Sequence, residues 1–209
     1  SVLEGAKFDP TTIIGGIVNK YKSTVRVGKG KWMVTEADES DGSLINLFPK
    51  IAVVTNINAE HMDFYKTYDD LQKYFLNFIN NTPFDGTSVL CNDNLGIKKL
   101  IKNIKNKNFI TYGFSKDSNV CAKNIVFKKQ YSIFDVEIKE NFFLKKEVIK
   151  RVNLNMLGNH NILNSLAAIT VGKILNIDTK KIKQTLKQFK GIKRRFTFVG
   201  EINGIKIID

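Results

Sequence analysis

Residues 51–91 read IAVVTNINAEHMDFYKTYDDLQKYFLNFINNTPFDGTSVLC. Apolar runs open and close the stretch, and between them apolar residues recur three or four positions apart. This pattern predicts a strand, a helix and a second strand, at Ile51–Thr55, Asp69–Asn80 and Ser88–Cys91. Thr67 precedes the helix and Asp70 follows three residues later, which is the pattern of a capping box. The stretch therefore predicts one unit of an alternating α/β fold.

The same alternation continues on both sides of this stretch. Short apolar runs predict more strands, and one more helix carries isoleucines along one face. These elements are expected at Thr12–Ile14, Trp32–Thr35, Phe109–Tyr112 and Asn94–Lys105. Alternating strands and helices are typical of a parallel sheet covered by helices. We therefore predict the α/β class, with a mostly parallel sheet flanked by helices.

The pattern changes near residue 120, where β-branched and aromatic residues follow one another without a helix between them. A small antiparallel sub-sheet is predicted, with strands at Ile125–Phe127, Tyr131–Ile138 and Val148–Leu154.

The last third of the chain predicts two helices and a hairpin. The helices are expected at His160–Leu175 and Asp178–Phe189, the second with Asp178 as its N-cap and Gly191 as its C-cap. The hairpin is expected to join Phe196–Val199 to Ile205–Ile208 around Asn203-Gly204, a strong turn signal.

Composition limits the protein class. Hydrophobic residues make up 43% of the 209, enough for an ordinary core, and no apolar run approaches the roughly 18 residues that span a bilayer. We find no signal peptide and expect no membrane contact. Cys91 and Cys121 lie outside any metal-ligand spacing, and we interpret both as buried thiols of a protein in a reducing cytoplasm.

The formal net charge of +13 raises a nucleic-acid-binding alternative, because Lys and Arg neutralise phosphates. Only four of the 33 basic residues are Arg, and Lys is abundant along the whole chain. That distribution favours solvated lysines over a dedicated basic surface. Binding of duplex DNA that weakens steeply with salt would support the alternative.

An acidic stretch follows the strand expected at Trp32–Thr35. It reads Glu36-Ala37-Asp38-Glu39-Ser40-Asp41, with four carboxylates in six residues. In parallel α/β sheets ligands bind where strands end, and crowded carboxylates need a cation or N–H donors to offset their repulsion. Oxygen-rich clusters suit Mg²⁺. The alternative is a solvated acidic loop.

A second polar stretch, residues 55–63, follows the strand expected at Ile51–Thr55. It contains His61, one of only two histidines in the chain. This side chain suits metal binding or acid–base work, and the alternative is an ordinary loop histidine. Glu36 and His61 are expected at the carboxyl ends of adjacent parallel strands.

Two further stretches contain groups suited to a nucleotide. Residues 158–168 read GNHNILNSLAA, which offers N–H donors and planar amides at a helix start; the alternative is close helix packing. Residues 191–196 read GIKRRF, where Arg194 and Arg195 suit a bidentate phosphate clamp; the alternative is a solvated basic turn.

Taken together and in this order, these segments resemble the Mur ligase family over essentially the whole chain. The resemblance implies that Glu36 and His61 hold a catalytic Mg²⁺ and that Arg195 contacts the phosphates of ATP, with Arg194 beside it. It also implies that the adenine lies beside an asparagine-rich segment, at His160, Asn161 and Asn164. Residues 13–16 (IIGG) match a turn that usually has Asn at its start. Glu60 stands where the family has Asp before the histidine.

The resemblance also implies the chemistry. Family members use ATP to join an amino acid to a UDP-muramyl carboxylate through an acyl-phosphate. The EADESD pattern resembles the branch that joins L-alanine to UDP-N-acetylmuramate, in the bacterial cytoplasm and as a step of peptidoglycan synthesis. Ser40 argues against the murein-tripeptide-reattaching branch, which has Tyr there. That branch remains the alternative.

No G-x-x-x-x-G-K-[ST] phosphate loop occurs in the 209 residues. We therefore expect residues 1–200 to be the family's central ATP-binding domain, incomplete at its N-terminus. Residues 201–209 are expected to begin the link to a C-terminal domain. An isolated chain of this extent is expected to be inactive as a ligase.

Overall fold

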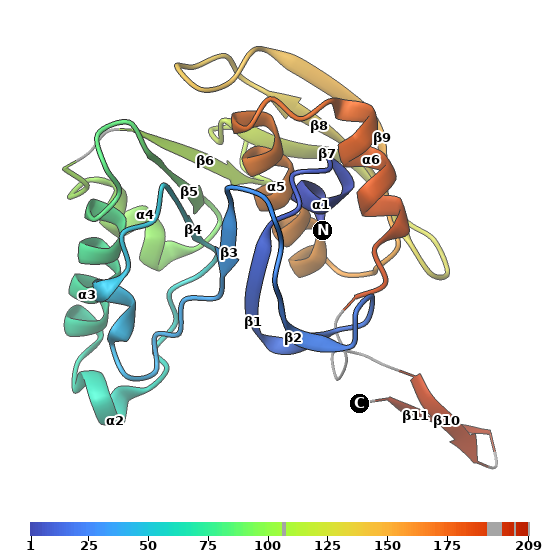
Figure 1. Ribbon diagram of the computed structural model, residues 1–209, viewed down its shortest axis with the longest axis horizontal. Coiled ribbons are helices and arrows are strands. Elements are labelled where there is room, and N and C mark those ends of the chain that lie inside the picture. Colours follow the sequence, from blue (N-terminus) through green and yellow to red (C-terminus); the bar gives the residue numbers. More distant parts are fainter. Residues whose placement is uncertain (106–107, 192–197, 203, 209) are drawn as a thin grey trace.

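The computed structural model describes residues 1–105, 108–191, 198–202 and 204–208 (Figure 1). Its largest sheet has six strands in the order β4-β5-β6-β7-β8-β9. Their bounds are Ile51–Val54, Thr87–Cys91, Phe109–Gly113, Val120–Phe127, Ser132–Ile138 and Glu147–Leu154. The first four strands run parallel and the last three form an antiparallel meander. The antiparallel part therefore continues the parallel sheet through the pairing of β6 with β7.

A second sheet has three strands in the order β2-β1-β3, at Ser23–Arg26, Thr11–Val18 and Met33–Thr35. β1 is antiparallel to β2 and parallel to β3, and it extends four residues beyond the predicted strand. The predicted hairpin is confirmed as β10 (Phe198–Ile202) and β11 (Ile205–Ile208), and Figure 1 shows it standing away from the rest of the molecule.

The four helices predicted from sequence are confirmed, with ends that shift by up to four residues. The helices of four or more residues are α1 (Val2–Gly5), α2 (Met62–Tyr65), α3 (Tyr68–Asn80), α4 (Leu95–Ile101), α5 (Asn159–Ile174) and α6 (Thr179–Gln188), with a 3₁₀ turn η1 (Ser43–Asn46). Thr67 Oγ1 accepts a hydrogen bond from the Asp70 N–H at 3.1 Å, as the capping pattern predicts. Asp178 caps α6 in the same way.

The predicted C-cap of α6 is wrong. The helix ends at Gln188, and its C-cap is Phe189 in an extended conformation. Gly191 lies two residues further on with a φ of 75°, a left-handed conformation that favours glycine. Its role is therefore to turn the chain after the helix has already ended.

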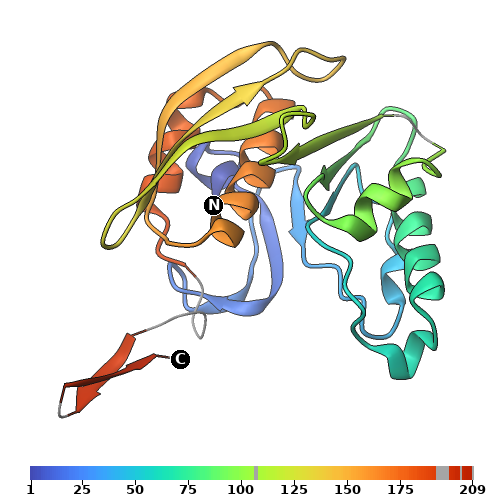
Figure 2. The ribbon, with the colours of Figure 1, turned by 180° about the vertical axis from the view of Figure 1, so that it is seen from behind.

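The core includes buried residues of the large sheet, of α5 and of α3 and α4. Helix α5 packs on β5, β6 and β7, while α6 packs on β9 (Figure 2). Ile162, Leu166 and Ile169 of α5 are fully buried, and all five residues of β5 are buried. A parallel strand buried on both faces reads as a continuous apolar run, which explains why β5 was recognisable from sequence.

β3 and β4 are the outer strands of their sheets. Figures 1 and 2 both show β3 between β1 and β4, yet no pairing among the described residues joins β3 to β4. Met33, Val34 and Val53 on these edges are 61%, 43% and 39% exposed. Exposed apolar edges pair readily with other chains, so we expect the isolated chain to associate.

One carboxylate on β8 accepts hydrogen bonds from both neighbouring strands of the meander. Asn124 on β7 and Arg151 on β9 both have left-handed φ angles, where each strand bulges beside β8. Asp135 on β8 accepts hydrogen bonds from Asn124 Nδ2 at 2.8 Å and from the Arg151 N–H at 2.7 Å. These two donors hold the pKa of Asp135 below its usual value.

Replacing this carboxylate should destabilise the fold. Because two hydrogen bonds to a partly buried charge are lost, Asp135→Ala should lower the unfolding free energy at pH 7 by about 1–3 kcal/mol. The folded pKa is depressed, so this contribution is present above the unfolded pKa near 3.9 and is lost as pH falls through the folded value. Urea unfolding at pH 7 and below 3.5 measures the difference. An equal effect from Asp117→Ala, at an exposed acid, would contradict the assignment.

Candidate functional site

The acidic loop after β3 gives three of its four carboxylates a backbone N–H partner. Asp38 Oδ1 accepts from Ser40 at 2.8 Å, and Asp41 Oδ1 accepts from Ser43 at 2.9 Å. Both bonds lower the pKa of the acid concerned. Local turns thus occupy the two aspartates, and this leaves the two glutamates, Glu36 and Glu39, as candidate ligands.

Glu36 is bound to β1. Its Oε2 accepts a hydrogen bond from the Gly15 N–H at 2.6 Å, and its own N–H donates to the Ile13 carbonyl at 2.9 Å. A Cβ on Gly15 would lie 3.3 Å from Glu36 Oε2, so the glycine lets the carboxylate approach the strand closely. One carboxylate oxygen is therefore fixed on the strand, and the other has room to bind a cation.

Glu39 faces His61. Its Oε1 lies 3.7 Å from His61 Nε2, and ligand atoms of Glu39, Glu60 and His61 all lie within 4.8 Å of one another. These three side chains are half-exposed or exposed. His61 immediately precedes α2, with a left-handed φ of 56°. The sequence singled out His61 with Glu36, whereas the structure places it beside Glu39 and Glu60.

An aromatic cluster positions this acidic loop on α2 and α3. Tyr65 is 3% exposed, and its hydroxyl donates a hydrogen bond to the Glu39 carbonyl. Its ring packs edge-on against Phe64 and Tyr74. Burial and the nearby Glu39 charge raise the pKa of Tyr65 to about 12. No sequence pattern marked Tyr65, because its contact with the loop spans 26 residues.

The expectation that Glu36 and His61 end adjacent parallel strands is wrong. β3, which precedes Glu36, pairs with β1, whereas β4, which precedes His61, pairs with β5 in the other sheet. Each strand does run parallel to its own partner. The two candidate ligands therefore come from two sheets rather than from neighbouring strands of one sheet.

A pocket of about 990 Å³ lies at the start of α5. Its lining includes the three residues expected beside a nucleobase, His160, Asn161 and Asn164. Asn161 Nδ2 donates to the Leu157 carbonyl at 2.8 Å, while Asn164 is exposed. Gly158 has a φ of 97°, and a Cβ there would lie 2.7 Å from the His160 ring.

The pocket wall also contains residues that sequence reasoning missed. Apolar side chains from separate elements form much of it, namely Leu154, Met156, Leu157, Leu186 and Phe189. Asn19 and the Lys190–Gly191 turn complete the side nearest α6. Glu36 does not line this pocket. Arg194 and Arg195 lie outside the described residues, as does most of the basic segment that the sequence singled out.

The two cysteines lie on β5 and β7 of the large sheet. Cys91 and Cys121 are both free and buried, as predicted, and burial raises the pKa of each thiol. Across the described residues, no helix is long and apolar enough to cross a membrane.

Comparison with known proteins shows the family to which this fold belongs. The family model for the Mur ligase middle domain matches residues 18–172. The chain belongs to the Mur ligase family. It is 42% identical over its whole length to the UDP-N-acetylmuramate–L-alanine ligase of Acidiphilium cryptum, and 44% identical over 208 residues to that of Gluconobacter oxydans. This Mur ligase chain spans 44% of the length of each of these relatives.

Solved structures of the family have the same fold. The UDP-N-acetylmuramate–alanine ligase of Thermotoga maritima matches with a TM-score of 0.80 at 24% identity, over all of this chain and 45% of that one. The UDP-N-acetylmuramate:L-alanyl-γ-D-glutamyl-meso-diaminopimelate ligase of Neisseria meningitides matches with a TM-score of 0.76 at 20% identity, over 92% of this chain and 61% of that one. The mixed sheet with flanking helices is therefore the Mur ligase fold, as predicted.

The Tyr65 hydroxyl gives a test of how the acidic loop is held. Tyr65→Phe should lower the unfolding free energy at pH 7 by about 1 kcal/mol, because the bond to the Glu39 carbonyl is lost. The raised pKa means that the folded state favours the neutral phenol. Its contribution is therefore complete below pH 10 and is lost as pH rises towards 12.

Chemical denaturation at pH 7 and at pH 11 measures this loss. Tyr131→Phe, at a half-buried tyrosine directly before β8, is the control. If Tyr65→Phe and the parent lose the same stability between the two pH values, Tyr65 does not hold the loop in this way.

Proposed function

We propose that this chain is the nucleotide-handling part of an ATP-dependent ligase that joins L-alanine to UDP-N-acetylmuramate. The supporting observation is its 42% identity, across all 209 residues, to enzymes of that name. The acidic loop, His61 and the pocket at α5 all lie within the matched length. Peptidoglycan precursor synthesis and a cytoplasmic location in bacteria follow from the same proposal.

The proposed reaction has two steps. A carboxylate oxygen of UDP-N-acetylmuramate attacks the γ-phosphorus of ATP, which gives an acyl-phosphate and ADP. The amine of L-alanine then attacks the acyl carbon, an amide forms, inorganic phosphate leaves and the amine loses its proton to solvent. Phosphoryl transfer needs positioning and charge neutralisation more than acid–base catalysis. An acidic loop with a metal ligand, a cationic clamp and a base pocket meets that need.

We propose that Glu36 and His61 hold Mg²⁺, with Glu39 and Glu60 beside His61. Ligand atoms of His61, Glu39 and Glu60 gather within 4.8 Å, which supports a cation at His61. Glu36 is not in that group; its assignment follows from the resemblance to the family, and its one oxygen bound to Gly15 leaves the other for the ion. Bound there, the ion would neutralise charge on the transferring phosphoryl group. The carboxylates that form local turns, Asp38 and Asp41, are not assigned to it.

The nucleotide is assigned to the pocket at α5. We propose that Asn161 and Asn164, with His160 adjacent, border the adenine, and that Arg195, with Arg194 beside it, contacts the phosphates. Planar amides pair with the edge of a purine, and the apolar wall suits its faces. A guanidinium suits phosphate because its N–H groups match two oxygens.

The division into residues 1–200 and a following link from 201 stays a proposal. β10 runs across residue 200 and pairs with β11, so the hairpin belongs to both parts. The tripeptide-reattaching ligase remains the alternative enzyme. Structures of both kinds match this fold, so only the 42–44% identity and Ser40 favour the L-alanine reaction.

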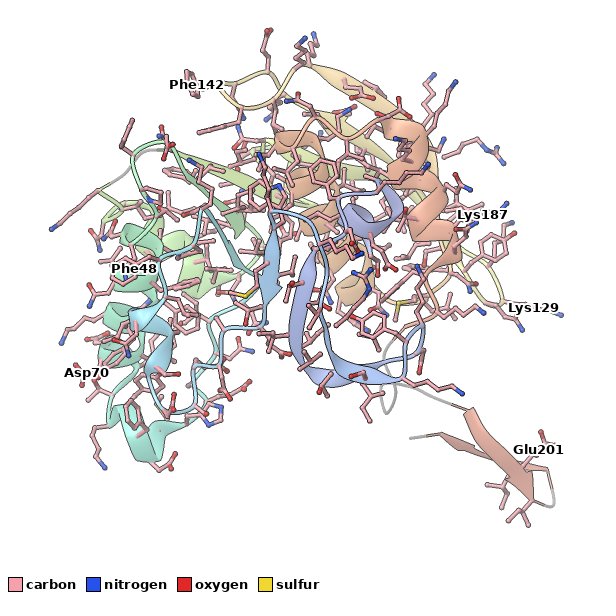
Figure 3. All side chains as sticks on the ribbon, viewed as in Figure 1. Phe48, Asp70, Lys129, Phe142, Lys187 and Glu201 are labelled. Carbon is pink, nitrogen blue, oxygen red and sulfur yellow. The ribbon has the colours of Figure 1, made fainter. Side chains whose placement is uncertain are left out.

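A nucleic-acid-binding role has less support. Figure 3 shows Lys129 and Lys187 extending outward from the surface, as solvated lysines do. Among the described residues, seven other basic side chains, His61 included, lie within ion-pair distance of an Asp or Glu of the same chain. We therefore propose small-molecule substrates, without a nucleic-acid or membrane partner.

The proposal predicts activity in a chimera and none in the isolated chain. In the chimera, this chain replaces the matching 209 residues of the Acidiphilium cryptum relative. We expect phosphate release with ATP, Mg²⁺, UDP-N-acetylmuramate and L-alanine at about 1 s⁻¹ or more, and far less when a murein tripeptide replaces L-alanine. The isolated chain should show no turnover, because no sequence in it supplies a phosphate loop and its lysine.

Each outcome separates the alternatives. A preference of the chimera for the tripeptide would favour the reattaching ligase. Turnover by the isolated chain would show that the loop is dispensable and that the proposed mechanism is wrong. A folded chimera without either activity would contradict the ligase proposal for this chain.

A further inference from the structure

The turn after α6 forms one wall of the large pocket without belonging to a helix or a strand. Phe189, Lys190 and Gly191 all line the pocket, and the helix before them ends at Gln188. In the sequence, Arg195 follows Gly191 by four residues. The position of this turn therefore contributes to the shape of the pocket.

Asn19 holds this turn from the opposite end of the chain. Its Nδ2 donates a hydrogen bond to the Lys190 carbonyl at 2.9 Å, across 171 residues of sequence. A Cβ on Gly191 would lie 4.0 Å from Asn19 Nδ2 and 3.8 Å from Met156 Cε. The turn thus rests on Asn19 and Met156, and Asn19 itself lines the same pocket.

Asn19 directly follows β1, the strand that also binds Glu36. Gly15 of β1 donates its N–H to the Glu36 carboxylate, and the strand ends at Val18. Four residues along a strand cover about 13 Å. One strand therefore connects the acidic loop to the wall of the pocket.

We propose that Asn19 is a positioning residue, which fixes the Lys190–Gly191 turn as a wall of the nucleotide pocket. The inference rests on the proposed function, because it takes the pocket to be the ATP site. Asn19 acts through the turn and need not touch the nucleotide. A neutral side-chain hydrogen bond is worth up to about tenfold in an equilibrium constant, which sets the size of the expected effect.

The first measurement is hydrogen exchange on the 209-residue chain. Asn19→Asp keeps the size of the side chain but replaces the donor with an acceptor, so exchange at residues 189–191 should become faster. Asn108→Asp is the matched control, because Asn108 Nδ2 also donates to a distant carbonyl, that of Phe84, away from the pocket. Unchanged exchange in Asn19→Asp would overturn the proposal.

The second measurement is steady-state kinetics in the chimera defined above. Asn19→Asp and Asn19→Ala should raise the KM for ATP by about three- to tenfold and leave the KM for L-alanine unchanged. Asn19→Gln keeps the donor, so its KM for ATP should lie between that of the parent and that of Asn19→Asp. Asn108→Asp should leave both KM values unchanged.

The outcomes separate this inference from the proposed function. If the parent chimera is active and Asn19→Asp has the same KM for ATP, the positioning role alone is overturned, even if hydrogen exchange becomes faster. A parent chimera that folds but makes no product would overturn the ligase proposal, and the inference with it. Equal increases in the KM values for ATP and L-alanine would indicate a general structural defect and would also overturn the positioning role.

Discussion

Electrostatic repulsion within the acidic loop is the constraint on which the candidate site depends. Four carboxylates within six residues repel one another unless hydrogen-bond donors or a cation offset their charge. Backbone N–H groups take up Asp38, Asp41 and one oxygen of Glu36, and His61 faces Glu39. Glu39 and Glu60 lie together beside His61, which immediately precedes α2. This arrangement is the basis of the proposed Mg²⁺ site, whose candidate ligands follow strands of two different sheets.

The two sheets meet this constraint through contacts that are distant in sequence. β1 binds Glu36 at one point, and Asn19, just after it, binds the turn that follows α6. Tyr65 ties the acidic loop to the helix that begins after His61. A fully buried parallel strand and α5 provide the rigid base on which these loops lie. Rigid elements with functional loops at their ends are the usual design of α/β enzymes.

Most of the fold was predictable from sequence, because burial leaves a periodic pattern. The buried run of β5 and the capped helix α3 were predicted within one or two residues, and the Asn203-Gly204 signal located the last hairpin. Candidate residues in the loops were also recognisable, since acids, His and Asn are conspicuous there. Pairing was not: no local pattern records that β3 joins β1 rather than β4, or that Asn19 contacts Lys190. The C-cap prediction for Gly191 failed because a left-handed glycine also occurs in turns beyond a helix end.

The central claim is that the acidic loop divides its carboxylates between structure and cation binding. The most direct measurement is the Mg²⁺ dependence of phosphate release by the chimera, with Glu36→Gln compared with Asp38→Asn, which removes a carboxylate charge of the same loop. The account predicts that Glu36→Gln raises the Mg²⁺ concentration for half-maximal rate by about tenfold or more, because one charged ligand is lost. Asp38→Asn should change it by less than about threefold and mainly lower stability. Equal effects of the two substitutions on the Mg²⁺ requirement would contradict the account.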